Sequence, residues 1–160
     1  MLIVVRAVTY ATVFIGFVLV FVPARILSEM GVKAPQSPGA FQAAGMLVTT
    51  LGGFLTLWCV STFAFVGKGT PAPFDPPRRL VVRGPYKLVR NPMYWGAGLV
   101  LTGAALFFQS AALAGYAALF MLLTHIFVWL YEEPTLRQTF GDDYDTYCRR
   151  TGRWFPRLKT

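Results

Sequence analysis

The stretch that decides the fold is residues 92–131, PMYWGAGLVLTGAALFFQSAALAGYAALFMLLTHIFVWLY. Its 40 residues contain no Asp, Glu, Lys or Arg. A helix of that length would be ~60 Å long, about twice the ~30 Å hydrocarbon core of a bilayer. The stretch therefore predicts two membrane-spanning helices, Pro92–Phe108 and Ala111–Tyr131, with Gln109-Ser110 as the tip of the hairpin.

Two further apolar stretches precede this hairpin. Phe41–Val66 has 26 residues without a charge, and Ala7–Val22 lies between Arg6 and Pro23. Ala7–Val22 could instead be a signal peptide, but the residues around Pro23 make a poor cleavage site, so we expect a retained helix. We expect this helix to end at Pro23, with Pro23–Ala40 as a loop on the outside. The proline-rich segment Thr70–Pro77 predicts an extended linker.

The composition favours a membrane protein. Of 160 residues, 55% are hydrophobic and only 14% are charged, whereas soluble domains carry about 25% charged residues. Such a chain is also too hydrophobic to be disordered. We therefore expect an all-α integral membrane protein with about four transmembrane helices.

The basic residues indicate both a partner and an orientation. The net charge is +8, and the positive residues lie beside apolar stretches, which favours an anionic membrane surface or ligand over nucleic acid. The segments 67–91 and 132–160 are rich in Lys and Arg, while the hairpin tip has none. The positive-inside rule then predicts that both termini and these basic segments are cytoplasmic.

The possible metal ligands are few. Cys59 lies in an apolar stretch, Cys148 in a charged tail, and His125 is the only histidine. These residues do not form a disulfide scaffold or a four-ligand zinc pattern, and we expect no metal centre.

A first polar cluster comes at the start of the third helix. Asn91 followed by Pro92 is typical of an N-cap and a first-turn proline. The positive end of the helix dipole beside Arg90 could bind a carboxylate or a phosphate. The alternative is an ordinary helix start with an arginine that reaches to the interface.

A second cluster ends the fourth helix. His125, Trp129 and Glu132 follow at i, i+4 and i+7, so they share one face. Glu132 and Glu133 beside an apolar span need a compensating partner, which is either an arginine or a cationic ligand. The alternative is that the two acids pair with Arg90 or a tail arginine and only stabilise the fold.

The C-terminal tail predicts two short helices. Gly141 breaks the first of them, and Asp142 is expected to cap the second. Aromatic side chains on one face and arginines on the other predict an amphipathic segment at the cytoplasmic interface, with residues 153–156 as an anchor. The aromatic stripe consists of Leu136, Phe140, Tyr144 and Tyr147.

Together these clusters resemble the isoprenylcysteine carboxyl methyltransferase family and its phospholipid methyltransferase relatives. The family pattern has Gly-x-Tyr, then Arg-His-Pro-x-Tyr-x-Gly, a helical hairpin, and Glu-Glu-x-x-Leu-x-x-x-Phe-Gly-x-x-Tyr-x-x-Tyr. This chain has GPY at 84–86, RNPMYWG at 90–96 and EEPTLRQTFGDDYDTY at 132–147. The resemblance covers about half of the chain, roughly residues 80–157.

The resemblance implies an S-adenosylmethionine-dependent integral membrane methyltransferase, with S-adenosylhomocysteine as product. It divides the single domain into an N-terminal two-helix part, residues 1–66, and a cofactor-binding part, residues 67–160. Glu132 and Arg90 are the implied catalytic residues. The implied cofactor-binding residues are Tyr86, Arg90, Asn91, Pro92, Tyr94, His125, Glu132, Glu133, Tyr144 and Tyr147.

One departure from the family pattern affects the chemistry. Asn91 stands where the family has histidine, and an asparagine cannot take up a proton near neutral pH. The methyl acceptor, a lipophilic or membrane-borne carboxylate, amine or thiol, stays open, as does the oligomeric state. No obligate protein partner is expected. The alternatives are a non-catalytic four-helix membrane assembly or lipid-binding protein, and a relative of the sterol reductases, which have many more spans.

Overall fold

The computed structural model describes residues 13, 15–37, 39–67 and 79–157, and over these residues the protein is helical. The predicted linker Thr70–Pro77 lies outside the described residues, and so do residues 7–12 and 14 of the first predicted span, Ala7–Val22. The elements in chain order are η1 (Gly16–Phe21), α2 (Val22–Glu29), α3 (Ala40–Thr62), η2 (Phe63–Gly67), η3 (Gly84–Lys87), α4 (Pro92–Phe108), α5 (Ala111–Phe127), η4 (Val128–Glu132), α6 (Glu133–Phe140) and α7 (Asp142–Arg150).

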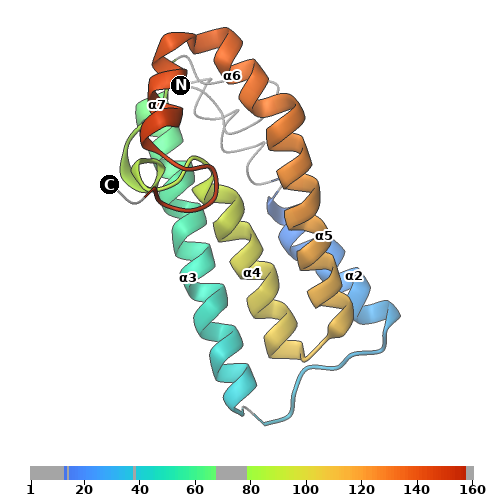
Figure 1. Ribbon diagram of the computed structural model, residues 1–160. Coiled ribbons are helices and arrows are strands. Elements are labelled where there is room, and N and C mark those ends of the chain that lie inside the picture. Colours follow the sequence, from blue (N-terminus) through green and yellow to red (C-terminus); the bar gives the residue numbers. More distant parts are fainter. Residues whose placement is uncertain (1–12, 14, 38, 68–78, 158–160) are drawn as a thin grey trace.

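Helix α4 lies between α3 and α5 in the centre of the fold (Figure 1). Glycines make the contact between α3 and α4 close. A Cβ atom built on Gly52 would lie 2.7 Å from the carbonyl oxygen of Gly96, and one built on Gly45 would lie 2.7 Å from that of Gly103. The two backbones therefore touch, as membrane helices do where small residues meet.

The hairpin tip is at Gln109-Ser110, which confirms the prediction. Gln109 ends α4 in the left-handed conformation with a φ of 49°, and the Ser110 hydroxyl caps α5 by accepting from the Leu113 N–H. The turn is short because the left-handed residue reverses the chain and the serine starts the next helix at once.

The helix that begins with α5 is longer than the predicted span that ends at Tyr131. It continues through the π-helical turn η4 into α6, so one helical run covers Ala111–Phe140. This run and α3 are long and apolar enough to cross a membrane, while α4 is apolar but shorter. The four-span arrangement stays a prediction.

The predicted helix end at Pro23 is wrong. Helix α2 continues to Glu29, and an exposed ion pair joins Arg25 and Glu29 within it. Pro23 is tolerated because it lies in the first turn of α2, directly after the π-helical turn η1, where the missing N–H costs little.

The C-terminal tail folds back against the protein. Gly141 breaks the helix with a φ of 51°, as predicted, but Gly141 rather than Asp142 occupies the N-cap position of α7. Tyr144 and Tyr147 of α7 are buried. The aromatic face of this helix therefore packs inside the protein, which corrects the prediction that it lies on a membrane surface.

The contact between α3 and α4 gives a stability prediction. A Cβ atom on Gly103 would clash with the Thr49 hydroxyl and lie 2.6 Å from the Thr49 N–H, whereas a Cβ atom on Gly115 meets nothing within 4 Å. Gly103→Ala should lower the stability by about 1–3 kcal/mol. Gly115→Ala should be neutral or stabilising, since alanine favours helix. Thermal unfolding of both variants checks this, and equal melting temperatures would contradict the close packing.

Candidate functional site

The start of α4 is covered by the tail segment, which we define as residues 151–155. The Arg90 N–H donates to the Gly152 carbonyl at 2.9 Å, and the Asn91 Nδ2 donates to the Arg153 carbonyl at 3.2 Å. One turn further, the Trp95 Nε1 donates to the Trp154 carbonyl at 2.9 Å. Three consecutive carbonyl groups of the tail segment are thus fixed on the first turn of one helix.

The predicted side-chain cap at Asn91 is wrong. Asn91 does occupy the N-cap position, and Pro92 is fully buried in the first turn, but no side-chain cap is formed. The Asn91 amide instead binds the tail segment. Anion binding by the free N–H groups at this helix start stays a prediction.

Glu133 holds two arginines from distant parts of the chain. Its carboxylate accepts two hydrogen bonds of 2.7 Å from the Nε and Nη2 of Arg153, and its Oε1 lies 3.0 Å from the Nη2 of Arg90. The side chains of Glu133 and Arg90 are only 10% and 11% exposed. A bidentate pair in such a setting is strong and directional, so Glu133 joins α6, the tail segment and the start of α4. Arg90 also contacts the Cys148 sulfur.

Glu132 has a different partner, although it is the next residue. Its Oε2 accepts a hydrogen bond of 2.9 Å from the Tyr94 hydroxyl, and within the described part of the chain it forms no ion pair. The expectation that the two acids have different surroundings is confirmed in their contacts. Their roles in binding or catalysis stay predictions.

His125 is held by an aromatic residue of the tail segment. The Trp154 Nε1 donates to the Nδ1 of His125 at 2.9 Å, and the two rings stack with their centroids 6.0 Å apart. Because Nδ1 accepts, the neutral imidazole carries its proton on Nε2. The rings of Tyr94 and Trp95 also pack against Trp154. Trp129, expected on the same face as His125, is 59% exposed.

Three of the tyrosines predicted to bind the cofactor, Tyr86, Tyr144 and Tyr147, are buried. Tyr144 and Tyr147 are buried, and the Tyr147 hydroxyl donates to the Tyr86 carbonyl at 2.6 Å. Burial raises the pKa of the Tyr144 and Tyr147 phenols, so both stay protonated donors at neutral pH. The Tyr86 hydroxyl is buried beside Cys59 and finds no oxygen or nitrogen partner in the described part of the chain.

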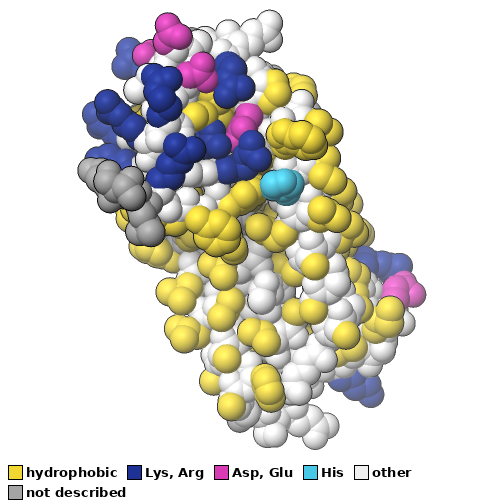
Figure 2. Space-filling model, in the orientation of Figure 1, with side chains coloured by type: hydrophobic (Ala, Val, Ile, Leu, Met, Phe, Trp, Pro, Cys, Tyr) yellow, Lys and Arg dark blue, Asp and Glu magenta, His cyan; other side chains and the backbone are white. Residues whose placement is uncertain are grey.

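The structure thus brings most of the predicted residues to one end of the bundle. Most of the Lys and Arg side chains on the visible face gather at this end, over α6, α7 and the tail segment, while hydrophobic side chains cover much of the remainder (Figure 2). We call the group of Tyr94, His125, Glu132 and Trp154 the aromatic–acid cluster. It lies beside the ion-pair cluster of Arg90, Glu133 and Arg153.

Sequence reasoning gave Gly152 no role and Trp154 only that of an interfacial anchor, so it missed both. The alternative that the acids pair with Arg90 and a tail arginine is confirmed for Glu133, whose tail partner is Arg153. Gly152 gives a local signal, because a Cβ atom there would clash with the Phe155 carbonyl. A tight turn at that point bends the tail back. The residues that the tail contacts lie some 60 positions earlier in the chain, and no periodic pattern in the sequence predicts this contact.

The ion-pair cluster gives a second stability prediction. Glu133→Gln leaves two partly buried guanidinium groups without their carboxylate and should cost about 3 kcal/mol. Glu132→Gln is the matched control on the adjacent residue, because an amide oxygen still accepts from Tyr94, so its cost should be small. Thermal unfolding in detergent measures both. A Glu132→Gln variant that melts as early as Glu133→Gln would contradict the assignment.

His125 can report on the tail segment directly. Since it is the only histidine, ¹⁵N-labelled histidine gives one pair of ring signals, and we expect them to show Nδ1 as a hydrogen-bond acceptor and the proton on Nε2. Trp154→Phe should remove the preference for a proton on Nε2. Trp129→Phe changes an exposed tryptophan in the helical run that carries His125, and it should leave this preference unchanged. An unaltered spectrum in Trp154→Phe would show that the Trp154–His125 hydrogen bond is absent in solution.

Comparison with known proteins places this chain in a family. The chain is 32% identical over 119 residues to the nickel-cobalt-cadmium resistance protein NccN of Alcaligenes xylosoxydans xylosoxydans, covering 74% of this chain and 51% of that protein. It is also 32% identical over 114 residues to the cobalt-zinc-cadmium resistance protein CzcN of Cupriavidus metallidurans, covering 71% and 48%. The chain spans about half the length of these curated relatives. Its residues 41–143 match the phospholipid methyltransferase family, and the chain belongs to that family.

Proposed function

We propose that this protein transfers a methyl group from S-adenosylmethionine to a lipophilic acceptor in the membrane. Family membership supports a methyltransferase that acts on membrane lipid. The observation that carries the finer proposal is the aromatic–acid cluster, in which Glu132 accepts from the Tyr94 hydroxyl and has no arginine partner in the described chain.

The residues of this end fit the donor by their chemistry. S-adenosylmethionine has a carboxylate, an ammonium group, a sulfonium and an adenine ring, so its site needs both charges and an aromatic wall. Glu132 offers a carboxylate for the ammonium group or the ribose hydroxyls, and Arg90 offers a cation. Tyr94, His125 and Trp154 offer ring faces, which attract cations and stack on bases. When bound, the donor supplies the electrophilic methyl group.

The protein's own groups must then orient the acceptor, exclude water and take up a proton where the acceptor has one to lose. A carboxylate acceptor has none to lose, whereas an amine or a thiol does. Glu132 is the better candidate to receive it, because its Oε1 forms no hydrogen bond with the described residues. His125 accepts on Nδ1 from Trp154 and so presents a donor on Nε2. This arrangement does not require the family histidine that Asn91 replaces.

The two relatives are named for metal resistance, and these names describe those proteins. Within the described residues, no group of three or more His, Cys, Asp and Glu side chains lies together. Our proposal for this chain rests on the family match and concerns a lipid acceptor, and the observations favour no second function.

Donor binding tests the proposal with a matched pair of variants. Calorimetric titration of the purified full chain with S-adenosylhomocysteine should give one site. Glu132→Gln should weaken binding by about tenfold, the loss of one charge-assisted hydrogen bond, while the melting temperature hardly changes. Glu133→Gln should instead lower the melting temperature. A folded wild-type chain that binds neither S-adenosylmethionine nor S-adenosylhomocysteine would overturn the proposal.

We also propose that the chain crosses the membrane four times with the candidate site and both termini in the cytoplasm. The basic residues at the site end support this orientation, since cytoplasmic segments are rich in Lys and Arg.

An impermeant thiol reagent on sealed cells tests the orientation. Ser37→Cys and Gln109→Cys should react from outside, since both positions are exposed and lie at the hairpin-tip end. Arg150→Cys, exposed at the opposite end, should react only after lysis. The parent chain, which contains Cys59 and Cys148, gives the background. The reverse pattern would invert the proposed topology.

A further inference from the structure

Two segments at the candidate-site end of the bundle run side by side. Val89 and Gly152 form a parallel β-bridge, and the Arg90 N–H donates to the Gly152 carbonyl at 2.9 Å. The chain continues past the tail segment to Arg157, whose Nη1 donates to the Arg149 carbonyl at 2.7 Å. The end of α7, the tail segment and the chain before α4 therefore form one continuous surface.

Exposed basic side chains gather on this surface. Lys87 and Arg150 each stand two residues before the bridge, and both are exposed. Arg149 and Arg157 are exposed too, and their guanidinium groups donate to neutral oxygens, the Thr146 hydroxyl and the Arg149 carbonyl. The ion pairs among the described residues involve other arginines. We define the basic rim as Lys87, Arg149, Arg150 and Arg157.

The acids of α7 leave the charge of the rim in place. Asp145 is already paired with Arg137 at 2.8 Å. Asp142 and Asp143 begin the helix, so two turns, ~10 Å along the axis, separate Asp142 from Arg149. Exposed charges at about that distance are largely screened at physiological ionic strength. Four like charges on adjoining segments therefore favour an anionic partner.

Two large apolar side chains are exposed within this basic surface. Leu88 directly follows Lys87 and is 64% exposed. Phe155 is 71% exposed, although one edge of its ring packs on Trp95 with the centroids 5.9 Å apart. Exposed apolar side chains among basic ones are typical of a membrane interface, where the apolar groups enter the acyl boundary and the basic groups meet phosphates.

The length of α4 gives the depth of the rim in a bilayer. From Pro92 to Phe108 the helix rises ~26 Å, close to the ~30 Å thickness of a hydrocarbon core. With the hairpin tip at one membrane surface, the start of α4 and the tail segment on it lie at the headgroups of the other leaflet.

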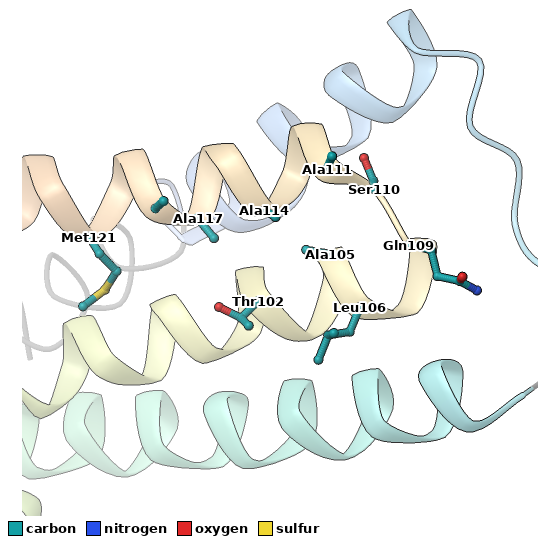
Figure 3. Close-up of a pocket in the computed structure, with 10 residues that line it drawn as sticks. Thr102, Ala105, Leu106, Gln109, Ser110, Ala111, Ala114, Ala117 and Met121 are labelled. Carbon is teal, nitrogen blue, oxygen red and sulfur yellow. The ribbon is translucent and has the colours of Figure 1, made fainter.

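The groove near the hairpin tip differs from the rim in its charge. It lies between α4 and α5 beside Gln109 and Ser110, and its lining residues are uncharged, half of them alanine (Figure 3). Most of the Lys and Arg side chains on the visible face lie at the site end instead (Figure 2). An anionic headgroup therefore finds its complement at the site end.

We propose that the basic rim binds the headgroup phosphates of anionic phospholipids in the leaflet at the site end, with Leu88 and Phe155 inserted into the acyl boundary beside them. The rim favours anionic over zwitterionic headgroups, because a zwitterionic headgroup also carries a positive group that the rim repels. The inference rests on insertion in a bilayer and goes beyond the proposed function. None of these side chains belongs to the aromatic–acid cluster or to the ion-pair cluster.

Native mass spectrometry of the full chain tests the proposal. The chain in detergent is mixed with equal amounts of phosphatidylglycerol and phosphatidylcholine that have the same acyl chains, so only the headgroup differs. We expect the chain to retain phosphatidylglycerol over phosphatidylcholine by at least about tenfold, since each basic residue near a lipid surface contributes about fivefold. Equal retention of the two lipids would overturn the proposal.

Two variants of exposed basic residues locate the bound lipid. Arg150→Gln removes one charge of the rim and should reduce the ratio of phosphatidylglycerol to phosphatidylcholine about fivefold. Lys33→Gln removes an exposed charge of the same sign between α2 and α3, and it should leave the ratio unchanged. An unchanged ratio in Arg150→Gln, or an equal loss in Lys33→Gln, would contradict the proposal. Binding of S-adenosylhomocysteine should be the same in all three proteins, so a failure here is distinct from a failure of the methyltransferase assignment.

Discussion

The pairing of Glu133 with Arg90 and Arg153 is the interaction on which the candidate site depends. One carboxylate joins the end of the long helix, the start of α4 and the tail segment. Two arginines around one partly buried carboxylate offset its desolvation, which a single exposed pair would not do. Arg90 and Arg153 are thus paired with Glu133, while Glu132 accepts from the Tyr94 hydroxyl. The two adjacent acids have different partners because the helix points them in different directions.

The same end is held by the backbone as well as by charge. Three carbonyl groups of the tail segment accept hydrogen bonds from residues at the start of α4, and the Trp154 Nε1 donates to His125. At the other end of the hairpin, α4 is fixed against α3 by glycine contacts. Helix α4 therefore has a close neighbour on its α3 side and a groove on its α5 side.

Local signals in the sequence predicted the helix start at Pro92, the tip at Gln109-Ser110 and the break at Gly141, because each depends on neighbouring residues. The end at Pro23 was wrong, since a preceding π-helical turn placed that proline where helices tolerate it. The fold of the tail could not be predicted, because Asn91 and Arg153 meet across 62 positions. Motif order predicted the set of site residues, but only the structure separates the acid that pairs with arginines from the acid that binds a phenol.

Hydrogen–deuterium exchange of the Arg90 amide tests the central claim, that Glu133 holds the tail segment on α4. This N–H donates to the Gly152 carbonyl of the tail segment, so its exchange should be slow in the wild-type chain. It should be markedly faster in Glu133→Gln, because losing the carboxylate frees the segment to open locally. Amides around the hairpin tip, far from Glu133, should exchange at the same rate in both proteins. An Arg90 amide that exchanges as slowly in Glu133→Gln as in the wild type would contradict the account.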